Sequence, residues 1–100
     1  MSELMHYVLF RLKDGALTAN VKNDFENTFA ALKAAMSEDI IEASVKFNCI
    51  ERDANMDVMV VLHLASKESL PKYLVHPIHT DFAKRTDPIL ISRCSFDYEL

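Results

Sequence analysis

Four segments of the chain alternate between two sets of side chains in the way that a β-strand does. In the first segment, His6 and Phe10 fall on one face and Tyr7 falls on the other. The third segment is apolar on both faces, and a turn at residues 52–55 connects it to the second. The four predicted strands cover residues 4–12, 41–51, 56–65 and 89–99.

Two further segments have the spacing of amphipathic helices. The first helix is expected to begin after Thr18, a good N-cap residue, and to extend to about Ser37. Its apolar positions are 4, 4, 3 and 4 residues apart and make one stripe: Val21, Phe25, Phe29, Leu32 and Met36. A shorter helix, capped by Ser66, is expected to end near Val75, because Pro77 cannot extend a helix begun before it. Pro77 then starts a new turn at the first helical position, which proline favours.

The order of these elements is β-α-β-β-α-β, the ferredoxin-like arrangement of the α+β class. It predicts a four-stranded antiparallel sheet with strand order 4-1-3-2 and two helices on one face. Two helices leave the other face uncovered, although the first strand carries Met5, Tyr7 and Leu9 there and the third is apolar on both sides. We therefore predict a homodimer packed sheet to sheet as a dimeric α/β barrel, with Tyr7 and His63 in or near the interface.

The composition is that of an ordinary globular domain. The chain has 100 residues, of which 50% are hydrophobic and 26% are charged, so we expect one domain over residues 1–100. The net charge is −4 and the basic residues are scattered, which argues against nucleic-acid binding. No apolar run approaches the ~20 residues of a membrane span, and the N-terminus lacks signal-peptide features, so we expect a cytoplasmic protein without a membrane partner. Cys49 and Cys94 are expected on opposite edge strands, too far apart to bond within one chain.

Residues 70–82, L-P-K-Y-L-V-H-P-I-H-T-D-F, carry the best candidate chemistry. On one straight helix Tyr73 and His79 would point to different sides, but a bend at Pro77 could swing His79 back toward Tyr73. His79 could then act as a general base, with Tyr73 orienting it or donating a hydrogen bond to an enolate. In the alternative, His79 packs on its helix and bonds Tyr73 or a backbone carbonyl, and Tyr73 is a half-buried aromatic residue. We interpret His76 as a structural cap of the new turn.

His6 lies on the strand face that should meet the helices, where an imidazole needs a partner. Either a pocket or a hydrogen bond in the core would supply that partner. The expected pocket walls are apolar residues of the first helix and of two strands: Val8, Phe10, Phe25, Phe29, Val58 and Val60. His76 and His79 lie three residues apart, but Pro77 disrupts their spacing, and no phosphate loop, nucleophile elbow or cofactor fingerprint occurs. We therefore expect neither a metal nor a cofactor.

Three stretches of the sequence form a familiar pattern: H-Y-V-L-F-R at residues 6–11, Y-x-x-H-P-x-H-x-x-F at 73–82 and F-D-Y-E at 96–99. In this order and spacing they resemble the Dabb family, the stress-responsive α/β-barrel domains. The resemblance covers essentially the whole chain. It implies a ferredoxin-like fold and a homodimeric barrel.

The resemblance also implies roles for three residues. One characterised member of the family, the plant polyketide cyclase olivetolic acid cyclase, performs a cofactor-free aldol condensation. His79 matches its general base, Tyr73 matches the tyrosine that supports the base, and His6 matches a histidine that lines the same pocket. The sequence departs from that cyclase at Val58, where the cyclase has a pocket histidine, and at Ser44, where a glycine is usual.

Two functions of different classes are compatible with this sequence. The first is a cofactor-independent enzyme that uses a His/Tyr pair for proton transfer on a small carbonyl or aromatic, polyketide-like compound. The second is a non-catalytic stress-responsive protein that binds a small hydrophobic ligand. A cofactor-free monooxygenase-like activity is a third, drawn from other dimeric barrels by analogy of fold. A pocket of a few hundred Å³ that contains both His6 and His79 would favour the enzyme.

Overall fold

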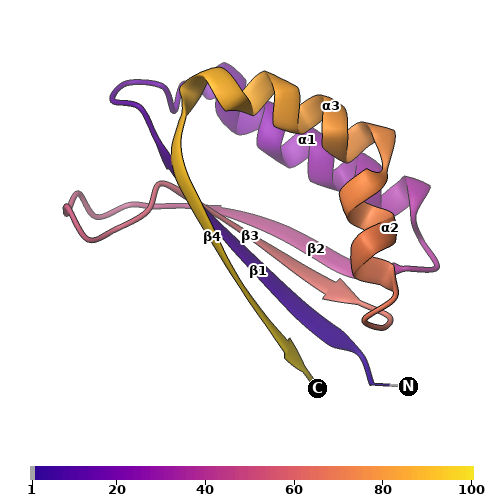
Figure 1. Cartoon of the computed structure of the whole chain (residues 1–100). Coiled ribbons are helices and arrows are strands. Elements are labelled where there is room, and N and C mark those ends of the chain that lie inside the picture. Colours follow the sequence, from indigo (N-terminus) through magenta and orange to yellow (C-terminus); the bar gives the residue numbers. More distant parts are fainter. Residues whose placement is uncertain (1) are drawn as a thin grey trace.

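A four-stranded antiparallel sheet forms one layer of the molecule and helices form the other (Figure 1). The structure is a computed structural model and describes residues 2–100. Its strand order is β2-β3-β1-β4, so the predicted order and the ferredoxin-like fold are confirmed. The elements are β1 (Leu4–Leu12), α1 (Ala19–Ala35), β2 (Ile40–Phe47), β3 (Val58–Leu64), α2 (Ser69–Val75), α3 (Pro77–Thr86), the short 3₁₀ helix η1 (Asp87–Ile89) and β4 (Leu90–Glu99).

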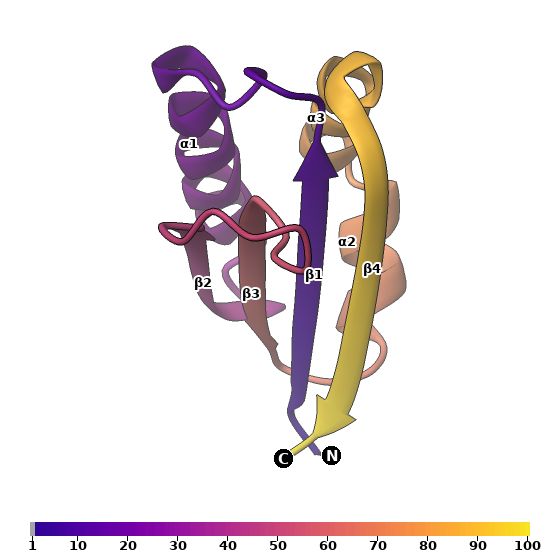
Figure 2. The same cartoon turned by 90° about the vertical axis from the view of Figure 1, so that its left-hand side faces the viewer.

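All the helices lie on the same face of the sheet (Figure 2). Helix α1 runs behind β2 and β3, whereas α2 and α3 run behind β1 and β4. The second predicted helix ends at Val75 as expected, but the segment that starts with Pro77 is a ten-residue helix, α3, and not only a turn, so the helix layer holds one more helix than predicted. Helix α1 therefore covers one half of the sheet, and the α2–α3 pair covers the other half.

The core lies between the two layers and follows the predicted alternation. Every second residue of the two central strands is buried: Leu4, His6, Val8, Phe10 and Leu12 of β1 and Val58, Val60, Leu62 and Leu64 of β3. The two strands pair in register from Leu4 opposite Leu64 to Phe10 opposite Val58. From α1, Phe25, Phe29 and Leu32 pack onto them with almost no exposed surface. The period-two pattern therefore places His6 inside the protein, on the helix side of the sheet.

The strand predicted over residues 41–51 is shorter than expected. It ends at Phe47, because after this residue asparagine side chains make local hydrogen bonds that compete with the backbone pairing between β2 and β3. The Asn48 amide donates to the carbonyl of Ile50 at 2.6 Å, and the Asn55 amide donates to the side-chain oxygen of Asn48 at 3.0 Å. The next strand accordingly starts at residue 58 and not 56. Cys49 lies in this loop rather than on an edge strand, and both cysteines are free.

The two predicted helix caps have different outcomes. Thr18 caps α1 as expected, since its hydroxyl accepts the backbone N–H of Val21 at 3.2 Å. Ser66 does not cap α2: the residue at that position is Glu68, without a side-chain cap, and the backbone carbonyl of Ser66, not its side chain, accepts the N–H of Ser69. The difference arises because residues 66–68 form a separate turn before the helix begins.

The bend between α2 and α3 is built around His76. Its backbone is extended, with φ −64° and ψ 136°, as expected for a residue that precedes proline. Its Nδ1 accepts the backbone N–H of Ile78 at 3.1 Å and so caps α3, which confirms the structural role predicted for this residue. The cap leaves the His76 ring outside the pocket described below.

We predict that His76→Ala lowers the free energy of unfolding by about 0.5–2 kcal/mol, because α3 loses its N-terminal side-chain acceptor. His76→Asn should recover most of that loss, since asparagine is a good N-cap residue. Urea denaturation of the two variants and the wild type measures the difference. Equal stability of the alanine and asparagine variants would exclude the capping role.

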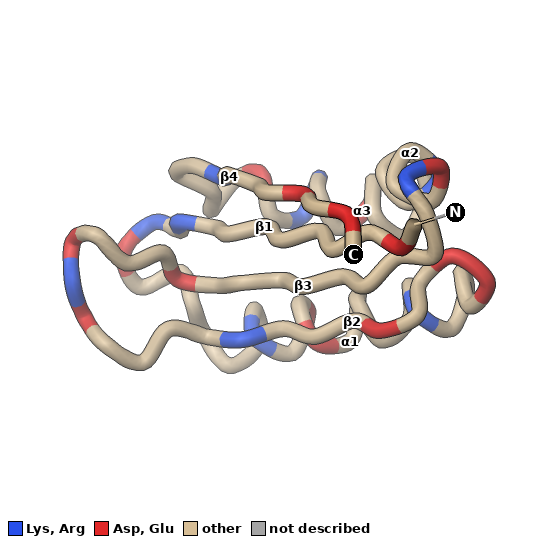
Figure 3. The backbone as a smooth tube through the Cα atoms, turned by 90° about the horizontal axis from the view of Figure 1, so that it is seen from below, with Lys and Arg blue, Asp and Glu red and all other residues tan. Residues whose placement is uncertain are grey.

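The face of the sheet away from the helices is largely apolar. We call its part on β1, β3 and β4 the open sheet face; it consists of Met5, Tyr7, Leu9, Met59, Val61, His63, Cys94, Phe96 and Tyr98. The edge strand β2 adds Glu42, Ser44 and Lys46 beside it on the same side of the sheet. Phe96 is 66% exposed and Tyr98 42% exposed, and the Tyr98 ring stacks on that of Tyr7 with centroids 6.0 Å apart. Figure 3 views this face and shows that β1 and β3 carry no charged residue along their middle. An apolar surface of this kind is typical of an interaction site.

Candidate functional site

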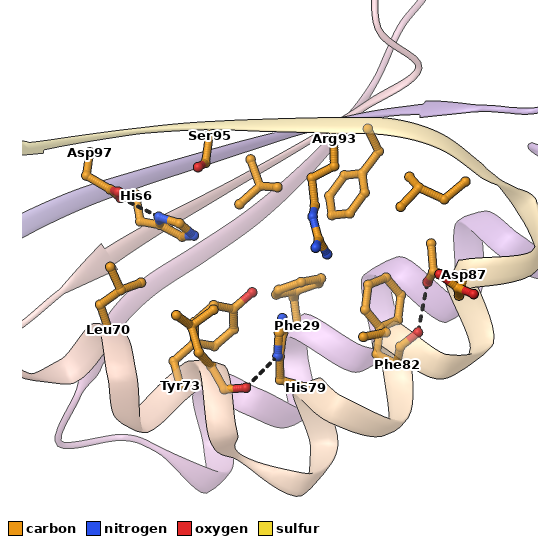
Figure 4. A pocket seen from close by; sticks show the side chains of 16 residues that line it. His6, Phe29, Leu70, Tyr73, His79, Phe82, Asp87, Arg93, Ser95 and Asp97 are labelled. Carbon is orange, nitrogen blue, oxygen red and sulfur yellow. Dashed lines mark hydrogen bonds and ion pairs between the residues drawn. The ribbon is translucent and has the colours of Figure 1, made fainter.

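A pocket of about 410 Å³ lies between the inner face of β1 and β4 and the helices α2 and α3 (Figure 4). Its polar lining includes His6, Tyr73, His79, Arg93, Ser95 and Asp97. Apolar side chains from both layers, among them Phe29, Leu70 and Phe82, make up other parts of the wall. The structure therefore brings together His6 and His79, which lie at opposite ends of the sequence.

His6 is fixed by a carboxylate on the neighbouring strand. The antiparallel register places it opposite Asp97 of β4, and its Nδ1 is hydrogen-bonded to the Asp97 carboxylate. Since a carboxylate accepts, Nδ1 donates, and the other ring nitrogen, Nε2, faces the pocket (Figure 4). The imidazole is only 5% exposed, so its orientation is set by this bond and by the packing around it.

His79 is fixed by the last turn of α2. Its Nδ1 lies 3.0 Å from the carbonyl oxygen of Leu74. A carbonyl can only accept, so Nδ1 carries the proton, and the neutral ring keeps its lone pair on Nε2. The backbone bond considered as an alternative thus exists, and it leaves the second nitrogen available.

The environment keeps His79 in its neutral form. Burial lowers the pKa of His79 below its ordinary value, and the electrostatic effects of Arg93 and of the neighbouring His6 lower it further. The hydrogen bond to Leu74 opposes these effects but does not reverse them. A neutral imidazole with a free nitrogen in a pocket is the form that can accept a proton.

Tyr73 connects the two imidazoles. Its ring centroid is 4.5 Å from that of His79 and 5.9 Å from that of His6, and its hydroxyl points into the pocket (Figure 4). The side chain is 2% exposed, and burial raises the pKa of the Tyr73 phenol far above its ordinary value. Tyr73 therefore remains a protonated hydrogen-bond donor and does not act as a base.

Three functional candidates were missed in the sequence. Arg93, Ser95 and Asp97 are alternate residues of β4 and all face the pocket. The signal was present, because the alternation of the last predicted strand places these residues on the side of the helices. The register between β1 and β4, which places Asp97 opposite His6, could not be predicted from the sequence.

The six apolar residues expected to line a pocket are divided between this pocket and the core. Val8, Phe10 and Phe29 line the pocket, whereas Phe25, Val58 and Val60 are buried in the core and do not. The reason is the position of the pocket, which lies under α2 and α3, while Val58 and Val60 belong to β3 on the other side of β1. Phe25 is enclosed by other rings, with centroids 4.9 Å from Phe82 and 5.2 Å from Phe10.

Residues 2–100 contain neither a metal-binding cluster nor a membrane-spanning helix. No three His, Cys, Asp or Glu side chains of this part of the chain are grouped so that they could hold a metal ion. None of its helices has the length and apolar character needed to cross a membrane.

The family model of the stress responsive A/B barrel domain, Dabb, matches residues 4–100. The chain belongs to the Dabb family. The resemblance of its three sequence stretches to that family is thereby confirmed. No curated protein matches the chain significantly.

Solved structures with the Dabb chain's fold include proteins of different kinds. A dimeric ferredoxin-like protein of unknown function from Bacteroides fragilis is 25% identical, with a TM-score of 0.83 over 100% of this chain and 98% of that one. A dimeric ferredoxin-like protein of unknown function from Thermobifida fusca is 23% identical, with a TM-score of 0.82 over 99% and 92% of the two chains. The hydroxynitrile lyase from Passiflora edulis is 14% identical, with a TM-score of 0.78 over 99% and 94%. At such identities the last two comparisons concern the fold alone.

Proposed function

We propose that this Dabb protein is a cofactor-independent enzyme that moves a proton on a small carbonyl or aromatic compound, with His79 as the base. One observation carries the proposal: His6 and His79 each have Nδ1 held by a protein acceptor and Nε2 turned to the same pocket. Two oriented imidazoles on opposite walls of a small pocket are more than packing requires. The presence of an enzyme, a hydroxynitrile lyase, among proteins of this fold is consistent with the proposal.

The chemistry would begin at a carbon next to a carbonyl group. Nε2 of His79 removes the proton from this carbon, and the electron pair of the broken C–H bond moves onto the carbonyl oxygen to form an enolate. The hydroxyl of Tyr73, which stays protonated, donates a hydrogen bond to that oxygen. The proton that Nε2 of His79 has taken is returned from the same nitrogen, and His6, held by Asp97, presents a second ring nitrogen across the pocket.

Non-catalytic binding of a small hydrophobic ligand is the second candidate function. It is favoured by the apolar part of the wall, to which Val8, Phe10, Phe29, Leu70 and Phe82 contribute. A binding protein of this kind would retain its ligand chemically unchanged. The two functions therefore differ in whether the bound compound exchanges protons with the solvent.

Deuterium exchange tests the choice between them. A panel of β-keto compounds, phenols and a hydroxynitrile is first screened by thermal shift, because any ligand that binds the folded state raises the melting temperature. Each compound that binds and carries an enolisable C–H is then incubated with the protein in D₂O, and loss of its signal is followed by ¹H NMR. Exchange faster than in buffer supports the enzyme. Binding without any accelerated exchange across the panel would refute it and favour the binding protein.

We propose also that the protein is a homodimer that buries the open sheet face. The two dimeric proteins of the same fold support this, as does the apolar character of that face. Phe96→Glu should raise the dimer dissociation constant by about a hundredfold or more, because a carboxylate would be buried without a partner. Sedimentation velocity over a concentration series measures the effect.

Val75→Glu is the matched control for the dimer. Val75 is 74% exposed, but it lies on α2 in the helix layer. This variant should sediment as the wild type does. A wild-type protein that is monomeric at micromolar concentration, or a Phe96→Glu variant that still dimerises, would contradict the proposed interface.

A further inference from the structure

Arg93 is exposed to solvent, and its side chain points to the pocket side of the sheet. It lies on β4, on the helix side of the sheet, and its guanidinium is directed into the pocket beside Phe29 and His79 (Figure 4). Its charge acts on the two proposed functional groups: it adds to the effect of burial that lowers the pKa of His79, and it partly opposes the effect of burial that raises the pKa of Tyr73. Arg93 is therefore part of the electrostatic environment in which the proposed chemistry would occur.

Within residues 2–100 no carboxylate forms an ion pair with Arg93. Two acidic residues share the pocket with it, but Asp97 is bound to His6, and Asp87 is not within ion-pair distance. Two of the other three arginines have partners: Arg85 contacts Asp24 at 2.9 Å, and Arg11 donates to the carbonyls of the loop after β2. The third, Arg52, lies in that exposed loop, away from this pocket. A guanidinium that lines a partly apolar pocket and has no carboxylate partner there is available to bind an anion.

We propose that Arg93 binds a carboxylate of the substrate, so that the substrates are small carboxylic acids with an acidic C–H, such as β-keto acids. This inference rests on the proposed function, since it names the substrate class of the same pocket. A carboxylate suits the fork of the guanidinium, which presents two parallel N–H donors to its two oxygens. The substrate would then lie with its charged end at β4 and its reacting carbon near His79.

The pocket favours one negative charge over two. Arg93 is the one arginine among the residues that line the pocket, and two carboxylate side chains, Asp87 and Asp97, line it as well. A phosphate dianion would leave an uncompensated charge there, whereas a carboxylate is neutralised by a single guanidinium. The apolar side chains Phe29, Leu70 and Phe82 complete a wall suited to the hydrocarbon part of such an acid.

Matched neutral and charged ligands test the inference. 3-Phenylpropanoate, 3-phenylpropanamide and phenyl phosphate are titrated into the ¹⁵N-labelled protein, and dissociation constants are taken from the amide chemical shifts. We expect the carboxylate to bind at least about tenfold more tightly than the amide and the phosphate. Arg93→Gln should abolish the preference for the carboxylate over the amide, and Arg93→Lys should retain part of it.

Lys84→Gln is the control for the loss of one positive charge. Lys84 is exposed on α3 and does not line the pocket, so this variant should keep the full preference. Equal affinity of the wild type for carboxylate and amide, or a preference that survives Arg93→Gln, would overturn the inference. Tighter binding of phenyl phosphate than of the carboxylate would also overturn it.

A parallel exchange assay separates this inference from the proposed function. The α-protons of 3-oxo-3-phenylpropanoate and of its amide are followed in D₂O with the wild type and with Arg93→Gln. A carboxylate preference in binding without accelerated exchange would uphold Arg93 as an anion site and refute the enzyme. Accelerated exchange of the acid and the amide at equal rates would support the enzyme and refute Arg93 as a carboxylate site. An equal fall for both compounds in Arg93→Gln would assign Arg93 to the enolate oxygen and overturn the carboxylate site.

Discussion

His79→Gln is expected to slow the exchange of α-protons by about 100- to 10,000-fold relative to the wild type, the usual contribution of a positioned general base. Glutamine keeps much of the volume of the side chain and can still donate to the carbonyl of Leu74, so the helix end need not rearrange. What the variant lacks is a nitrogen lone pair in the pocket. The measurement is the first-order loss of the ¹H signal of the ligand that exchanges fastest with the wild type.

His76→Asn is the matched control for this variant. It removes another imidazole from the same bend but keeps an N-cap acceptor for α3 and lies outside the pocket. Its exchange rate should stay within about twofold of the wild type, an expectation that follows from the absence of contact with the reacting atoms. If His79→Gln exchanged protons as fast as the wild type, His79 would not be the base.

The lowered pKa of His79 determines the pH dependence of exchange. A group with a lowered pKa stays neutral at pH values where an exposed imidazole, with a pKa of about 6.5, is already protonated. Exchange should therefore persist as the pH falls through about 6.5 and decline only at the lower pKa of the folded protein. The same shift means that the unfolded chain binds this proton more readily, so acid should destabilise the wild type more than His79→Gln. An acid limb of exchange at or above pH ~6.5 would contradict the assignment.

Phe25→Ala is expected to lower the free energy of unfolding by about 3–5 kcal/mol, the usual cost of truncating a buried phenylalanine. The side chain is 1% exposed, and its ring meets the edges or faces of Phe10, Phe47 and Phe82. Its removal would leave a cavity inside the core and not an enlargement of the pocket. Urea denaturation at fixed protein concentration measures the loss, because dimerisation makes the apparent stability depend on concentration.

Leu74→Ala is the control for position. Leu74 lines the pocket and is 44% exposed, so its truncation should cost about 1 kcal/mol or less. A small loss for Leu74 and a large loss for Phe25 would follow from the separation of pocket and core. Similar losses for the two variants would mean that Phe25 is not the core residue that its burial indicates.

The fold was predictable because its main signals are local. Alternation in β1 and β3 places each side chain on its face, and Pro77 marks the division between α2 and α3. The errors in the fold occur where side chains compete with backbone hydrogen bonds. Asn48 ends β2 early, and Ser66 belongs to a turn before α2 and not to its cap.

The candidate site was predictable where its signal is local, in the alternation that turns His6 toward the helices and in the bend at Pro77. Tyr73 and His79 could be predicted because the proline between them, Pro77, indicates the bend that brings their rings together. The partner of His6 was not found, because Asp97 is 91 positions away and depends on the register of β1 with β4. The stripe of α1 likewise does not tell Phe29, which reaches the pocket, from Phe25, which does not.

Strand β4 takes part in two surfaces at once. Arg93 and Asp97 face the pocket, and Phe96 and Tyr98 between and beyond them belong to the open sheet face. Ligand preference and self-association can therefore diverge independently in evolution, by substitutions at odd-numbered and at even-numbered positions respectively. Insertion or deletion of one residue within β4 would exchange the two sets of side chains, so this strand should tolerate changes of residue but not of length.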